Sequence, residues 1–117
     1  MHHKDLEVWK KAIELVKLVY IITDDLPHKE EYGLCSQIRR AVVSIPSNIA
    51  EGCARFSSKE TVRFLDIALG SLAEVDTQLI IARELGYLQS NDEVLELLGK
   101  VNALLIGLRK SVNERSE

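Results

Sequence analysis

Few residues in this sequence interrupt regular secondary structure. Its 117 residues include two prolines and six glycines, and only 5% are aromatic, whereas 46% are hydrophobic. This composition suits an all-helical protein, and no strand pattern competes with it. A chain of this length is long enough to bury a core of its own, so we expect one domain that spans residues 1–117.

An excess of positive charge is also lacking. The net charge of −3 argues against a strongly basic nucleic-acid binder, although it leaves room for a local basic patch. No apolar run approaches the roughly 20 residues that a membrane-spanning helix needs, and no signal-peptide hydrophobic region precedes the first acid. We therefore expect a cytoplasmic protein with no membrane partner.

Groups that commonly carry chemistry are scarce as well. Cys35 and Cys53 would lie about 27 Å apart along one helix, too far for a disulfide, so they indicate free thiols in a reducing compartment. The sequence has no Glu-x-x-His pair, with which helical bundles bind two metal ions, and no glycine-rich phosphate loop. We expect no enzyme, with no catalytic residue, metal or cofactor.

Apolar periodicity and capping signals predict four helices, at about residues 5–26, 30–52, 57–86 and 90–112. Pro27 ends the first helix, and Gly52 ends the second as a left-handed cap. The segment Ser57-Ser58-Lys59-Glu60 is a capping box that opens the third. Because the connections are short, the expected fold is an all-α, antiparallel up-down-up-down four-helix bundle.

The first and third helices each carry two apolar stripes. On the first helix, one stripe consists of Leu6, Trp9, Ile13, Val16 and Tyr20. Two stripes on one helix exceed what a monomeric bundle can bury, so the pattern predicts a homo-oligomer. A thicker internal core is the alternative interpretation.

Pro46 stands inside the predicted second helix, where a proline costs about 3 kcal/mol unless its neighbours compensate. Ser44, Ser47 and Asn48 can bond to freed backbone groups, so we expect a kinked but continuous helix. Glu51 faces the negative end of the helix dipole, and its partner is expected from another helix or subunit. Pro46 inside the helix and Glu51 near its C-terminal end both depart from the usual helix preferences, and two departures in one segment indicate a function or a special packing contact. The alternative is a kinked helix whose surface acid is paired.

The whole pattern resembles a known family. The resemblance lies in residues 5–9, 31–34, 37–41, 64–65 and 70–74, and most specifically in Ser44-Ile45-Pro46-Ser47-Asn48-Ile49-Ala50-Glu51-Gly52. These segments resemble the bacterial four-helix bundle proteins that include the proteins encoded in intervening sequences of 23S ribosomal RNA genes. That family is similar to the accessory variability determinant of diversity-generating retroelements, a pentameric bundle that binds reverse transcriptase and nucleic acid. The resemblance implies a homopentamer and RNA or DNA binding, with no known catalytic activity.

The candidate nucleic-acid-binding residues are Arg39, Arg40, Arg55, Lys59 and Arg63. The last three cluster around the second connection, whereas the first two lie roughly 18 Å or more down the second helix, so a single patch needs another subunit. In a ring, repeated copies would multiply weak phosphate contacts. Alternatively, these side chains pair with acids and fix helix packing or the subunit interface, the candidate acids being Glu51, Glu60 and Glu74.

Two functions follow from this reading. The first is a nucleic-acid-associated accessory protein, a non-catalytic oligomer that acts near RNA or a nucleoprotein partner. The second is a scaffold that displays helix faces to a protein partner and does not bind nucleic acid.

Overall fold

The computed structural model describes residues 1–115, so the last two residues of the predicted domain, 116 and 117, lie outside the described residues. Four long helices make up the fold: α1 (Glu7–Thr23), α2 (Leu34–Cys53), α3 (Ser58–Glu84) and α4 (Asp92–Arg115). Two short 3₁₀ helices, η1 (His3–Asp5) and η2 (His28–Glu30), precede α1 and α2. No strand occurs in residues 1–115.

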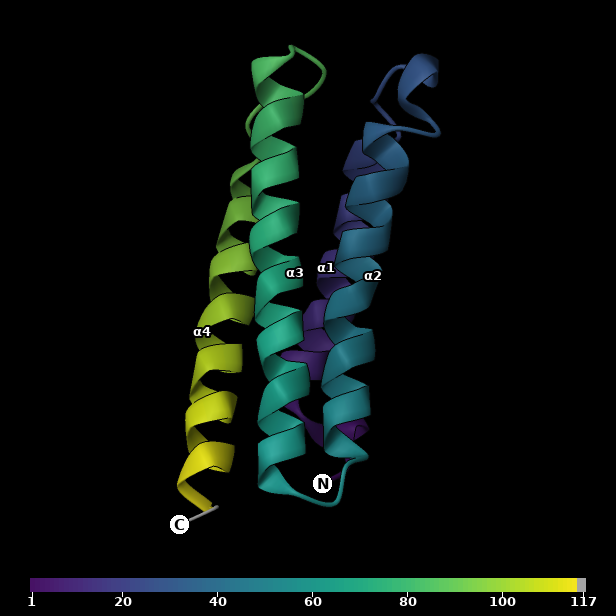
Figure 1. Cartoon of the computed structure of the whole chain (residues 1–117). Helices are drawn as coiled ribbons and strands as arrows, with labels where there is room; N and C mark the ends of the chain where they lie inside the picture. The colour runs from purple at the N-terminus through teal and green to yellow at the C-terminus, as the bar shows by residue number, and fades with distance from the viewer. Residues whose placement is uncertain (116–117) are drawn as a thin grey trace.

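The four helices alternate in direction along a molecule of 48 × 25 × 21 Å (Figure 1). Each helix packs on two neighbours, in the order α1, α2, α3, α4 and back to α1, and α2 with α3 forms the most extensive pair. Within the described chain, no Cα atom of α1 lies within 8 Å of one in α3, and none of α2 lies within 8 Å of one in α4. The predicted up-down-up-down four-helix bundle is thus confirmed, with the helices at the corners of a square.

The core takes one apolar stripe from each helix. Its largest fully buried side chains are Leu15, Ile38, Ile45, Ile49, Leu65 and Leu105. On α1, the buried stripe is Val8, Ala12, Leu15 and Val19. The other predicted stripe of α1 remains partly exposed, and its last member, Tyr20, is 40% exposed. No helix in residues 1–115 is long and apolar enough to cross a bilayer.

The connection between α1 and α2 differs from the prediction. Helix α1 begins at Glu7 rather than Asp5 and ends at Thr23, three residues before the expected end. Helix α2 begins at Leu34 rather than residue 30, because residues 28–30 form η2. The Glu30 carboxylate accepts a hydrogen bond from the Leu34 backbone N–H at 3.1 Å, so this acid caps α2 from outside the helix.

The prediction that Gly52 is a left-handed cap is wrong. Gly52 lies inside α2 and is buried, and the one residue of the described chain with a positive φ is Gly86, at 78°. A Cβ at Gly52 would lie 3.1 Å from Cβ of Phe64 on α3. This glycine therefore permits close packing of α2 on α3. The left-handed turn belongs to Gly86, after which the Tyr87 N–H donates to the Ala82 carbonyl at 2.9 Å.

The beginnings of α3 and α4 show two side-chain caps. The Ser57 hydroxyl accepts from the Glu60 N–H at 3.1 Å, which confirms the predicted cap of α3. On α4 the capping residue is Asn91, whose side-chain oxygen accepts from the Val94 N–H at 3.1 Å. Helix α4 continues through Val112, which is buried, to Arg115, beyond the predicted end at 112.

Candidate interaction surfaces

Helix α2 continues through Pro46, as the sequence predicts. The Asn48 amide donates to the Ser44 carbonyl at 2.8 Å, and the Ser47 hydroxyl donates to the Val43 carbonyl at 2.9 Å. Pro46 lacks the N–H that would reach the Val42 carbonyl, and the two side-chain bonds reach the next two carbonyls of the helix rather than that one. Short polar side chains therefore support the backbone beside the proline.

Ser44 also joins α2 to α3. Its hydroxyl accepts from the Asn48 amide at 2.9 Å and lies 2.8 Å from the hydroxyl of Ser71. The Pro46 segment thus ties together the two helices that pack most extensively, through hydroxyl and amide groups at their contact.

Glu51 has its partner within the same chain, so the prediction of a partner on another helix or subunit is wrong. The Arg55 guanidinium lies 2.7 Å from the Glu51 carboxylate, four residues further along. Ala54 keeps a helical backbone conformation after the end of α2, which leaves Arg55 within i,i+4 reach of Glu51.

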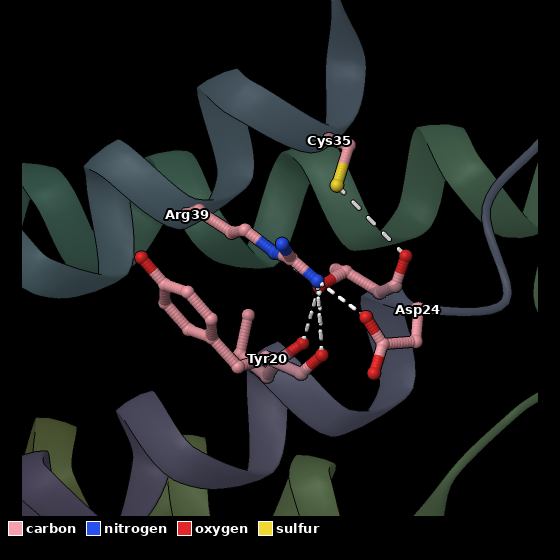
Figure 2. A network of polar contacts seen from close by, with 6 residues as sticks. Tyr20, Asp24, Cys35 and Arg39 are labelled. Atoms are coloured by element: carbon pink, nitrogen blue, oxygen red, sulfur yellow. Dashed lines mark hydrogen bonds and ion pairs between the residues drawn. The ribbon is translucent and has the colours of Figure 1, made fainter. Parts of the chain in front are cut away.

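Arg39 fixes the end of α1 against α2. Its guanidinium donates to the Thr23 hydroxyl at 3.0 Å, to the Tyr20 carbonyl at 3.2 Å and to the Asp24 carboxylate at 2.9 Å. Figure 2 shows this side chain reaching from α2 to α1 beside the Tyr20 ring, whose centroid lies 4.6 Å from the guanidinium carbon. These contacts use three of the five N–H donors of Arg39, which the sequence offered as a phosphate ligand.

Arg55 and Arg63 flank one aromatic ring at the start of α3. Their guanidinium carbons lie 4.7 and 5.5 Å from the ring centroid of Phe64. Arg63 also lies 3.4 Å from the Glu60 carboxylate. Two of the three expected acids, Glu51 and Glu60, therefore pair with these arginines, which agrees with the packing alternative.

Glu74, the third expected acid, pairs with no arginine in residues 1–115 and instead accepts from the Gln78 amide at 3.1 Å. Lys59 and Arg40 are exposed, and neither forms an ion pair within the described chain. Arg40 and Arg55 are 15 residues apart, about 22 Å along α2 at 1.5 Å per residue. One chain thus brings Arg55, Lys59 and Arg63 together and keeps Arg39 and Arg40 apart, as the sequence predicts.

Phe56 is a surface feature that the sequence reasoning missed. It is fully exposed in the turn between α2 and α3, beside Arg55 and close in sequence to Lys59. An aromatic residue in a polar connection was the available signal. Tyr32, at the opposite end of the bundle next to Glu31, is exposed to a similar degree.

Asp66 and Arg109 tie α3 to α4. The Arg109 Nε and Nη2 atoms both donate to the Asp66 carboxylate, and these bonds raise the pKa of the guanidinium further.

Cys35 and Cys53 are free thiols and both are buried. Burial raises the pKa of the Cys53 thiol, which makes it a poor nucleophile. In residues 1–115, no group of three or more His, Cys, Asp or Glu side chains could hold a metal ion.

Two hollowed surfaces of the bundle each expose a large apolar side chain to solvent. The first, here called the α1–α2 face, contains a hollow lined by Tyr20, Tyr32, Cys35, Ser36, Arg40 and Val43, among others. The second, the α3–α4 face, contains a hollow lined by Leu69, Ala73, Asp76, Leu95, Gly99 and Asn102, among others. Val43 on the first face is 40% exposed and Leu95 on the second is 42% exposed, so each face leaves large apolar side chains in contact with solvent.

Comparison with known proteins agrees with this architecture. The family model described as 23S rRNA-intervening sequence protein matches residues 4–107, which is most of the chain. The chain belongs to this family. The resemblance found in the sequence is therefore confirmed, and the match reaches into all four helices.

A solved structure of similar fold is that of a protein with unknown function from the S23 ribosomal protein family of Bacteroides thetaiotaomicron. It shares 24% sequence identity, covers 88% of this chain and 95% of its own, and superposes with a TM-score of 0.80. At this identity the likeness shows the fold alone. No curated protein matches the chain.

Proposed function

We propose that this protein is a non-catalytic scaffold in the cytoplasm that works as a homo-oligomer, a pentamer by family resemblance, and displays its remaining helix surfaces to a protein partner. The observation that carries this proposal is the pair of exposed apolar faces. A monomer with large apolar side chains at the mouths of two hollows would leave much apolar surface in water, and such surfaces mark interaction sites.

The arrangement of charge supports the same proposal. Arg39, Arg55 and Arg63 make ion pairs or ring contacts within the chain, so less of their charge is free for phosphates. The net charge of −3 also disfavours a polyanionic partner. Arg39 thus holds the end of α1 against α2, and Arg55 and Arg63 pair with acids that are close in sequence.

The proposal is tested by making an apolar face polar. Leu95→Lys combined with Ile106→Lys places two charges on exposed apolar positions of α4, and we expect the solution mass to fall to that of the monomer while the helical circular dichroism is kept. Ile21→Lys is the matched control, because Ile21 on α1 is 66% exposed and lines neither hollow. An unchanged mass in the double variant would contradict the proposal.

Nucleic-acid association is the second candidate, favoured by one specific observation. Fully exposed Phe56 directly follows Arg55 in the connection and precedes by three residues Lys59, which has no ion-pair partner in residues 1–115. An exposed ring next to cationic side chains suits the stacking of an unpaired base, with phosphates nearby.

The matching experiment is fluorescence anisotropy of a labelled structured RNA across a salt series. Under this candidate, log affinity falls linearly with log salt, Arg63→Glu or Arg55→Glu weakens binding with assembly intact, and Phe56→Ala lowers affinity severalfold. Ile21→Ala is the control, since Ile21 on α1 is 66% exposed and lines neither hollow. No binding at low salt would contradict this candidate and leave the protein scaffold.

A further inference from the structure

The two apolar faces lie on opposite sides of the bundle. Helix α1 packs on α2 and α4, helix α3 packs on the same two helices, and within residues 1–115 no Cα atoms approach within 8 Å across either diagonal. The α1–α2 face therefore lies opposite the α3–α4 face, because α1 and α2 lie side by side on one side of the bundle and α3 and α4 on the other (Figure 1). Two different faces on opposite sides suit a heterologous contact, in which one face of each copy covers the other face of the next.

Each hollow contains one charged side chain without an ion-pair partner in the part of the chain that the structure describes. On the α1–α2 face it is Arg40, and on the α3–α4 face it is Asp76. Arg39 at the first hollow binds Asp24, whereas Glu31 lies 3.8 Å from the exposed imidazole of His28, which is charged only when protonated. Arg40 and Asp76 thus place a cation on one face and an anion on the other, each without an ion-pair partner in residues 1–115.

Arg40 and Asp76 also lie at the same level along the bundle. The hydroxyls of Ser44 on α2 and Ser71 on α3 are 2.8 Å apart, which marks one common level. Arg40 is four residues before Ser44 and Asp76 is five residues after Ser71, so in antiparallel helices both lie toward the same end. At 1.5 Å per residue, their heights above this level are about 6 and about 7.5 Å.

Rotation about an axis parallel to the bundle leaves the height of every residue unchanged. Groups at equal height on opposite faces therefore meet when neighbouring copies are related in this way. We propose that the α1–α2 face of one copy packs on the α3–α4 face of the next around such an axis, with Arg40 of one copy paired to Asp76 of its neighbour. This inference rests on the homo-oligomer proposed above and names its contact surfaces.

A charge-swap series tests this contact. Arg40→Asp places two acids opposite each other at every interface, and Asp76→Arg places two arginines there. Because like charges in contact oppose association, each single variant is expected to raise the subunit dissociation constant at least tenfold at low salt. The double variant Arg40→Asp with Asp76→Arg restores opposite charges and is expected to recover most of the wild-type assembly. Mass is followed by analytical ultracentrifugation, and folding by circular dichroism.

The controls reverse charge at exposed positions that line neither hollow: Lys17→Asp for Arg40→Asp and Glu96→Arg for Asp76→Arg. Both controls are expected to assemble as the wild type does. A wild-type protein of monomer mass would contradict the proposed function as well as this inference. An oligomeric wild type whose single variants assemble unchanged, or whose double variant does not recover, would overturn this inference alone.

Discussion

At the scale of single residues, Arg39 has the largest set of polar contacts between two helices. It is 29% exposed and joins the Thr23 hydroxyl, the Tyr20 carbonyl and the Asp24 carboxylate. We expect Arg39→Ala to lower the free energy of unfolding by about 2 kcal/mol, since hydrogen bonds from charged groups contribute roughly 1.5–3 kcal/mol. Urea denaturation at constant protein concentration measures this loss.

Two further variants separate this network from a general effect of charge. Arg39→Lys keeps the charge but cannot reproduce the forked contacts and the stacking on Tyr20, so we expect it to recover only part of the stability. Lys59→Ala removes an exposed cation that has no partner in residues 1–115 and is expected to change stability by less than about 0.5 kcal/mol. Equal losses in Arg39→Ala and Lys59→Ala would contradict a structural role for Arg39.

Cys53 gives the chain a pH-dependent contribution to stability. Burial raises the pKa of its thiol, while the charge of the amino terminus acts in the opposite direction. The folded chain thus keeps the proton where the unfolded chain releases it, so this contribution is complete below the unfolded-state pKa, about 8.5, and is lost as pH rises through the folded-state pKa. We expect wild-type stability to fall more steeply with alkaline pH than that of Cys53→Ala. Parallel urea titrations that give equal slopes would contradict this prediction.

At the scale of helices, two glycines should respond in opposite ways to the same substitution. At Gly52 an added Cβ would meet Cβ of Phe64 at 3.1 Å and the Thr61 carbonyl at 3.2 Å, whereas at Gly70 no atom lies within 4 Å. We expect Gly52→Ala to destabilise the protein by about 1–3 kcal/mol through overpacking. Gly70→Ala should stabilise it by about 0.5–1 kcal/mol, because alanine has the better helix propensity. Thermal unfolding of both variants checks this, and a shift of the same sign in both would contradict it.

The number, order and core stripes of the helices followed from local signals, and several helix ends did not. The capping serine Ser57 and the continuity of α2 through Pro46 depend on neighbours within four residues, so the sequence predicted them. Gly52 is different, because its role depends on Thr61 and Phe64 across the α2–α3 contact. A glycine near a helix end predicts a left-handed turn until that contact is known.

At the scale of the molecule, some contacts of the candidate site could be predicted from the sequence and others could not. The ion pairs of Arg55 with Glu51 and of Arg63 with Glu60 could be predicted from the sequence, because the partners are three or four residues apart. The contact of Arg39 with Asp24 could not be predicted, because it depends on how the end of α1 packs on α2. The double apolar stripes of α1 and α3 predicted that apolar surface would remain exposed. Only the packing of all four helices shows which stripe that is.

Mass in solution tests the central claim, that this protein works as a homo-oligomer. Size-exclusion chromatography with light scattering at micromolar concentration measures it without a label or a partner. We predict a particle of several times the 13.2 kDa chain mass, because two apolar faces must be covered. A particle of 13.2 kDa that persists as concentration rises would contradict the account.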